Sequence, residues 1–212
     1  MLKKQKIKLI LTSVIILIPI LVGLLLWDQI PDQVVTHWDA KGVPNGWSSK
    51  LFAVVGLPLF LFAVHWICII GTKADPKYAN HPPKLMSLVY WICPIVSFFC
   101  MGSIYTEALG YTVPINDIGG IFVGVTFIFI GNYIPKCQQN YTMGIKIPWT
   151  LNSEENWNRT HRFAGPLWMI CGILFMVLTF IDYPILSVAV IFVAVLAPMI
   201  YSYVYYKKHE CK

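Results

Sequence analysis

His37 and Asp39, which flank a single tryptophan, are the residues whose types best suit metal-assisted chemistry in this chain. Imidazole nitrogen and carboxylate oxygen both bind divalent metals, so the pair could begin an N/O site. Glu107 and Asp117 are the carboxylates that could complete it. The chain has no His-Glu-x-x-His motif of a zinc protease. We therefore expect no cofactor, and we keep these four residues as the candidates for a divalent metal.

His65 is the one titratable side chain placed well inside an apolar run. We expect it to hydrogen-bond a neighbouring helix, with a functional proton or ligand site as the alternative. A proton-relay transporter normally uses a chain of buried ionisable residues. The sequence holds no such chain, which argues against transport or pumping. Gly119, Gly120 and Gly124 suit close helix contacts better than a phosphate cradle.

Six apolar runs must position these residues. The chain of 212 residues is 57% hydrophobic and 12% charged, whereas soluble domains are roughly 45–50% apolar and roughly 25% charged. A helical run of about 20 residues matches the hydrocarbon thickness of a bilayer, about 30 Å. The sequence therefore predicts an all-α membrane protein, a six-transmembrane-helix bundle. The predicted spans are residues 9–27, 51–70, 85–109, 118–134, 163–181 and 184–206.

The distribution of basic residues predicts the orientation. Of the 16 lysines and arginines, all but Lys41 and Lys50 fall on one side if the six spans are correct. Cytoplasmic loops hold lysine and arginine in excess, so that side is expected to be the cytoplasm, with both the N- and C-termini inside a bacterial cell membrane. Retained cytoplasmic charge also explains the net charge of +6 better than direct nucleic-acid binding does.

Two long connections divide the chain. We expect an amino-terminal two-helix region, residues 1–84 with an outer loop at 28–50, and a four-helix region, residues 85–212 with a cytoplasmic loop at 135–162. The outer loop is rich in turn residues, so a compact ordered loop is expected. Its acidic surroundings would attract a cationic peptide. The residues we predict to bind a ligand there are His37, Trp38, Asp39, Asn45 and Trp47.

The cytoplasmic loop carries too many large apolar groups to remain solvated without cost. From Ser153, as N-cap, we expect a short amphipathic helix at the inner membrane surface, with Trp157 and His161 on one face. These side chains either bind a partner or simply cap the helix bundle, and the two hypotheses stay equally open. The link at 71–84 shows nothing that demands a ligand. The residues we predict to bind a partner are Asn132, Asn140, Lys146, Pro148, Trp149, Thr150, Trp157, His161 and Arg162.

Two patterns, taken together, are similar to a known family. The amino-terminal one is Ile30-Pro31, Thr36-His37-Trp38-Asp39, Gly42, Pro44-Asn45-Gly46 and Lys50. The carboxy-terminal one is Gly131-Asn132-Tyr133, Pro135-Lys136, Asn140-Tyr141, Gly144-Ile145-Lys146, Pro148-Trp149-Thr150-Leu151, Trp157, Thr160-His161-Arg162 and Gly165. The second resembles the SdpI family of bacterial membrane proteins, named for the immunity protein against the sporulation-delaying protein toxin. The first resembles the domain of unknown function that is commonly fused to it.

The resemblance implies a non-enzymatic role in toxin resistance and signal transduction. Its expected partners are the lipid bilayer, a secreted cationic peptide toxin outside and a sequestered transcriptional repressor inside. Signalling of this kind needs two states with different affinities. The chain departs from the family at Lys146, where an arginine is expected, so a bidentate clamp is lost. Two alternatives remain open: a membrane metal-dependent hydrolase or protease using His37, Asp39 and an outer carboxylate, and a small transporter.

Overall fold

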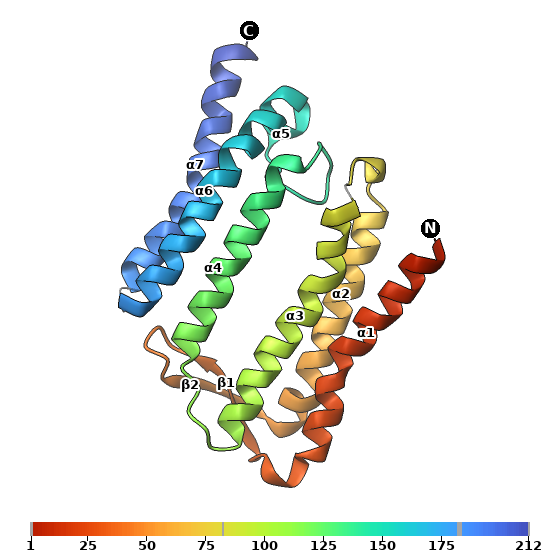
Figure 1. The fold of residues 1–212 in the computed structure, drawn as a ribbon, viewed down its shortest axis with the longest axis vertical. Helices are drawn as coiled ribbons and strands as arrows, with labels where there is room; N and C mark the ends of the chain where they lie inside the picture. The colour runs from red at the N-terminus through yellow and green to blue at the C-terminus, as the bar shows by residue number, and fades with distance from the viewer. Residues whose placement is uncertain (1, 82, 182–183, 212) are drawn as a thin grey trace. The chain divides into compact units, whose positions relative to one another are not determined.

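The computed structural model describes residues 2–81, 83–181 and 184–211, and six long helices dominate this part of the chain (Figure 1). All six are long and apolar enough to cross a membrane, which confirms the predicted multipass membrane protein. The helices are α1 Leu2–Leu25, α2 Leu57–Lys73, α3 Pro83–Ala108, α4 Ile115–Tyr133, α6 Glu154–Ile181 and α7 Pro184–His209. A π-helical segment, Phe52–Gly56, leads into α2, and a five-residue helix, α5 Pro148–Asn152, precedes α6.

The separate surface helix predicted from Ser153 is wrong, because its residues form the first turns of α6. Ser153 does act as the N-cap: its Oγ accepts a hydrogen bond from the Asn156 N–H at 3.2 Å. Trp157 and His161 do share a face, with ring centroids 4.1 Å apart. Both side chains are fully buried within the protein, so this face packs on the chain itself and the helix continues directly into the membrane-spanning run.

The outer loop folds as an antiparallel hairpin of β1 Gln33–Trp38 and β2 Pro44–Ser49. The sequence predicted an ordered loop here but not its strands. Gly42 turns the chain with a φ of 75°, a conformation that favours glycine. Val34, which is 1% exposed, anchors the hairpin in an apolar cluster with Met101 of α3. Burial of Val34 among the helices therefore determines which face of the hairpin packs on the protein and which face is exposed.

The described helices group into two compact units. The first comprises Met1–Gly71 with Met86–Ile115, and the second comprises Thr72–Leu85 with Asn116–Lys212. Packing thus places α3 with α1 and α2, whereas the sequence division assigned residues 85–108 to the second region. Long-range hydrogen bonds give the reason: Ser97 Oγ donates to the Ile16 carbonyl at 3.1 Å, and Tyr105 OH donates to the Pro19 carbonyl at 2.8 Å.

His65 of the first unit makes the interhelical contact expected for it. Its Nε2 lies 3.1 Å from Thr12 Oγ1 on α1, and the imidazole is fully buried. The Thr12 hydroxyl also lies 2.9 Å from the Lys8 carbonyl, which can only accept. The hydroxyl therefore donates to the backbone and accepts from the His65 ring. The interhelical prediction for His65 is confirmed.

In the second unit, α4 and α6 approach each other at glycine. A Cβ built on Gly124 would lie 2.6 Å from the Gly172 carbonyl oxygen, and one on Gly172 would lie 2.5 Å from the Gly124 carbonyl oxygen. Small residues allow such backbone approach between membrane helices, where packing rather than hydrophobicity drives association. The expected role of Gly124 as a close helix contact is confirmed, but Gly119 meets nothing within 4 Å.

Replacing Gly124 with alanine should therefore destabilise the second unit. The added methyl group would meet backbone, which cannot rotate away, so we expect a loss of about 1–3 kcal/mol, as for other overpacked interiors. Thermal unfolding in detergent measures it. Gly119→Ala, on the same helix but facing open space, is the matched control and should change little. Equal effects of the two substitutions would contradict the close contact.

Candidate functional site

The connection between α4 and α6 is organised around Asn140, whose side chain is fully buried. Its Oδ1 accepts hydrogen bonds from the backbone N–H groups of Met143 at 2.6 Å and Thr142 at 2.9 Å. Its Nδ2 donates to the Gln138 carbonyl at 2.8 Å and to Cys137 Sγ at 3.2 Å. The Asn140 side chain thus pairs backbone groups that a helix or strand would otherwise pair. It holds residues 137–143 in a single compact turn.

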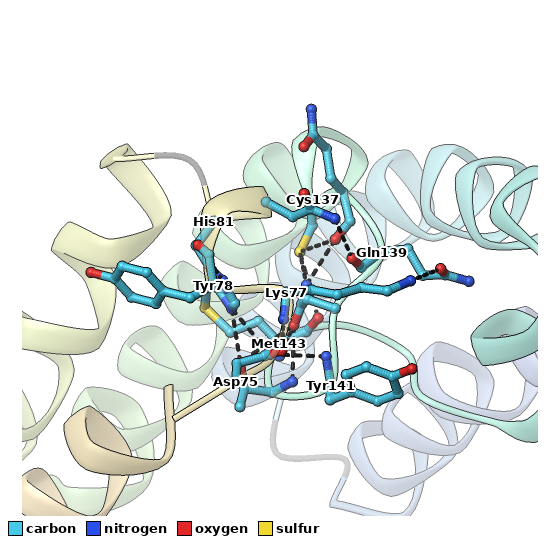
Figure 2. A network of polar contacts seen from close by, with 12 residues as sticks. Asp75, Lys77, Tyr78, His81, Cys137, Gln139, Tyr141 and Met143 are labelled. Carbon is cyan, nitrogen blue, oxygen red and sulfur yellow. Dashed lines mark hydrogen bonds and ion pairs between the residues drawn. The ribbon is translucent and has the colours of Figure 1, made fainter. Parts of the chain in front are cut away.

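Asp75 attaches the link between α2 and α3 to this turn (Figure 2). Its side chain is fully buried. Oδ1 accepts the Lys77 N–H at 2.8 Å, and Oδ2 accepts the Tyr141 N–H at 2.9 Å and the Thr142 hydroxyl at 2.8 Å. A buried carboxylate needs such partners because leaving it unpaired is costly. Asp75 therefore fastens the α2–α3 connection to the α4–α6 connection.

His81 completes this network. Its Nδ1 lies 3.0 Å from the Tyr78 carbonyl, which can only accept, so Nδ1 carries a proton. Its Nε2 lies 2.8 Å from Thr142 Oγ1 and 3.6 Å from Asp75 Oδ2. Because the Thr142 hydroxyl gives its single proton to Asp75, Nε2 must donate in turn. The hydrogen bonds thus suit a doubly protonated, positively charged ring beside the Asp75 carboxylate.

The electrostatics of Asp75 follow from these contacts. Burial alone would raise the pKa of its carboxyl group, because it disfavours the charged form. The hydrogen bonds from Lys77, Thr142 and Tyr141, together with nearby His81, outweigh burial and hold the pKa of Asp75 below its usual value. The network is therefore built for an ionised carboxylate at neutral pH.

Gln139 extends the connection to α5. Its Nε2 donates to the Thr150 and Leu151 carbonyls, each at 2.9 Å. Lys77 Nζ donates to Gln139 Oε1, and Asn80 Nδ2 donates to the Gln139 carbonyl at 2.8 Å. A single glutamine thus joins the link, the loop and the short helix.

The start of α6 closes the other side of the loop. Trp157 Nε1 donates to the Cys137 carbonyl at 2.7 Å. The Ile145 N–H donates to His161 Nε2 at 2.9 Å, so His161 Nδ1 carries the proton and donates to the Trp157 carbonyl at 2.7 Å. Gly144 crosses these rings with a φ of +116°, and a Cβ there would lie 2.5 Å from His161 Nε2. Only glycine fits both the conformation and the space.

Lys146, the departure from the family pattern, has a local role. Its Nζ donates to the Thr142 carbonyl at 3.0 Å and to the Tyr141 carbonyl at 3.3 Å, while the side chain stays exposed. A compact ammonium suits two carbonyl oxygens in a turn, for which a planar guanidinium fork is not required. Lysine at this position therefore stabilises the same loop that Asn140 organises.

Burial separates the predicted partner-binding residues into two groups. A partner can reach only exposed side chains, whereas the buried ones build the loop. Fully buried are Asn140, Thr150, Trp157 and His161. Exposed are Asn132, Lys146, Pro148 and Arg162, and Trp149 is half-buried. The ring of Trp149 packs on Tyr203 and Tyr206 of α7, with centroids 5.3 and 6.1 Å away.

The predicted ligand-binding residues of the outer hairpin also divide. His37, Asn45 and Trp47 are exposed, with Trp47 at 56%. His37 Nδ1 and Asn45 Oδ1 are 2.6 Å apart across the strands, which requires the imidazole to donate. Trp38 is half-buried and packs on the apolar cluster that anchors the hairpin. A ligand approaching the hairpin thus meets an imidazole, an amide and an indole.

Asp39, the other residue predicted to bind a ligand, stabilises the turn of the hairpin. Its Oδ1 accepts the backbone N–H groups of Lys41 at 2.8 Å and Val43 at 2.9 Å. Glu107, proposed as a metal ligand with it, accepts the Val113 N–H at 3.4 Å. Across the described ranges, no group of three or more His, Cys, Asp or Glu side chains is placed to hold a metal ion.

Asp75, His81 and Gln139 are the site residues that sequence reasoning missed. The link was expected to carry no special function, yet it holds a buried acid and a buried histidine. One sequence feature could have drawn attention to Asp75 and His81: each is followed directly by proline within a short connection. Their partners lie more than 60 residues away, so no local pattern could identify the pairing.

Comparison with known proteins matches both halves of the chain. The model of the SdpI/YfhL protein family matches residues 136–202, and a domain of unknown function, DUF1648, matches residues 14–62. The chain is also 28% identical to "Immunity protein SdpI" of Bacillus subtilis (strain 168) over 206 residues, which are 94% of this chain and 96% of that protein. No solved structure matches it.

The matched segments coincide with the two sites. The hairpin lies inside residues 14–62, and Asn140, Lys146 and Trp157 lie inside residues 136–202. The resemblance inferred from the residues is therefore confirmed in both halves. Residues 136–202 are thus similar to the SdpI/YfhL protein family and residues 14–62 to DUF1648, and the six apolar helices make the chain a multipass membrane protein.

Proposed function

We propose that this protein is a membrane immunity protein that protects its cell against a secreted peptide toxin. The carrying observation is the similarity to "Immunity protein SdpI", which extends over nearly the full length of both chains. The excess of lysine and arginine on one side supports an orientation with both termini in the cytoplasm. In this orientation the hairpin faces outward, where a secreted peptide first meets the cell.

The hairpin supplies the surface for toxin recognition. His37, Asn45 and Trp47 project from it, and the apolar cluster beneath holds it rigid. An exposed tryptophan contributes a large contact area and also attracts cationic side chains through its ring face. The toxin would therefore bind through basic and apolar side chains of its own.

Survival of a toxin-sensitive bacterial strain tests this function. Expression of the protein should raise survival against a cationic peptide toxin, and Trp47→Ala should reduce that protection at least about tenfold, as expected for a binding hot spot. Trp66→Ala, which removes a partly exposed tryptophan of α2, is the control and should keep protection. Absence of protection by the unaltered protein would refute the proposal. Degradation of the toxin that depends on His37 would point to a hydrolase instead.

We also propose that the cytoplasmic face signals toxin binding by retaining a transcriptional repressor. The exposed side chains of Asn132, Lys146 and Pro148 would contact it, supported by the rigid loop. Toxin should then move a fluorescent repressor fusion to the membrane. Pro148→Ala should weaken this movement while survival is retained. A repressor that stays cytoplasmic in the presence of toxin would contradict the signalling role.

A further inference from the structure

A second surface, distinct from the buried network around Asn140 and from the hairpin, lies along α6 and α7 of the second unit. It is an open groove of about 720 Å³. Its lining combines acidic and polar residues at one end with aromatic residues at the other: Glu154, Glu155, Asn158, Arg159, Arg162, Phe163 and Tyr201. We propose that this groove binds the phosphate headgroup of an anionic phospholipid.

The charges in the groove leave one guanidinium available. Arg159 is engaged with Glu155: its Nη2 and Nε lie 2.9 and 3.0 Å from Glu155 Oε1. Arg162 is exposed and, among the residues that the structure describes, makes no hydrogen bond or ion pair. Glu154 lies eight residues earlier, about 12 Å along the helix, too far to neutralise it. Arg162 therefore offers a free, planar fork that matches a phosphate group.

The depth of Arg162 is that of a lipid headgroup. It directly precedes the uncharged run at 163–181, whose helical length of about 28 Å equals the hydrocarbon layer. Phe163 continues the groove into that layer, stacked on Tyr201 with centroids 4.7 Å apart and planes at 9°. The guanidinium thus lies at the phosphate level, and an aromatic wall begins where the acyl chains do.

Further positive charge on the same side favours an anionic lipid over a neutral one. Lys207 and Lys208 occupy the last turn of α7 and are exposed. Basic residues near the membrane surface attract anionic lipid. The two lysines do not line the groove, so they raise the local lipid concentration, while Arg162 fixes the position of the bound headgroup.

Native mass spectrometry of the full chain in detergent tests the site, with phosphatidylglycerol and phosphatidylcholine as probes. We expect phosphatidylglycerol to bind more tightly than phosphatidylcholine, and Arg162→Gln to weaken it about tenfold, the loss expected for a charge-assisted contact. Arg162→Lys should give an intermediate value. Lys208→Gln removes the same charge outside the groove and should change binding less than twofold.

Several results would overturn the assignment. Equal weakening by Arg162→Gln and Lys208→Gln would show attraction to net charge without a defined site. Displacement of the lipid by millimolar inorganic phosphate would show a free-anion site, and displacement by a polyglutamate peptide would show a protein-docking surface. Because Arg162 has no contact to lose, its variants should keep the unfolding temperature of the unaltered protein, and toxin protection is scored separately.

Discussion

Replacing Trp157 with alanine is expected to lower the free energy of unfolding of the second unit by about 3–5 kcal/mol, the range for a large buried aromatic residue. Trp157 is the largest fully buried side chain in the described chain. The substitution would also leave the Cys137 carbonyl without the indole N–H that it accepts at 2.7 Å. Cavity and lost hydrogen bond act in the same direction, since a buried unpaired carbonyl is itself costly.

Thermal unfolding in detergent and limited proteolysis of the loop measure this effect. The cleavage rate should rise in residues 137–147, because Trp157 and His161 form the surface on which that segment folds. Trp47→Ala removes an indole that is 56% exposed and serves as the matched control, with an expected change within about 0.5 kcal/mol. An unchanged unfolding temperature for Trp157→Ala would show that the loop is held by other contacts.

Asp75→Asn should be comparably destabilising at neutral pH, by about 3 kcal/mol, the lower range for breaking a buried charged pair. An amide cannot accept all the hydrogen bonds that the carboxylate receives from Lys77, Tyr141 and Thr142. It would also leave His81 beside an uncharged group. Asp32→Asn is the control, because its carboxylate is 99% exposed and pairs with Lys50 only at the surface, a contact worth at most about 1 kcal/mol.

The pH dependence has a definite sign. The pKa of Asp75 is lower in the folded protein than its usual value. Its contribution is therefore fully present above the unfolded pKa of about 3.9 and is lost as the pH falls through the folded pKa. The stability difference between the unaltered protein and Asp75→Asn should shrink as the pH falls below about 4. Unfolding curves at several pH values measure it, and a difference that grows on acidification would contradict the assignment.

The resemblance and the structure contribute different information about the cytoplasmic loop. The pattern around Asn140 and Trp157 identified the family, but it could not tell whether these residues contact a partner or build the loop. Their complete burial assigns them a structural role. The exposed positions, Lys146 and Arg162 among them, are the ones left for recognition. Partner binding thus stays a prediction for the exposed residues, whereas the buried residues build the loop.

Helix ends show a similar division. Ser153 was identifiable as an N-cap because capping depends on neighbouring residues, and its contact with Asn156 is local. The continuation of α6 through the expected surface helix was not identifiable. It depends on Trp157 packing against Cys137, 20 residues earlier. The hairpin was missed as strands for the same reason, since the cluster that buries Val34 includes Met101 of α3, far away in the sequence.

The sequence by itself determined the membrane class, the six apolar spans and the two long connections between them. These follow from runs of apolar residues and from turn residues, both of which are local properties of the chain. Only the tertiary structure decided that Asp75 and His81 fasten the α2–α3 connection to the α4–α6 connection, and that, within the described chain, Arg162 lies unpaired beside two aromatic rings. The physical reason is distance along the chain: Asp75 and Tyr141 are 66 residues apart, so only the folded chain brings the carboxylate and the N–H together.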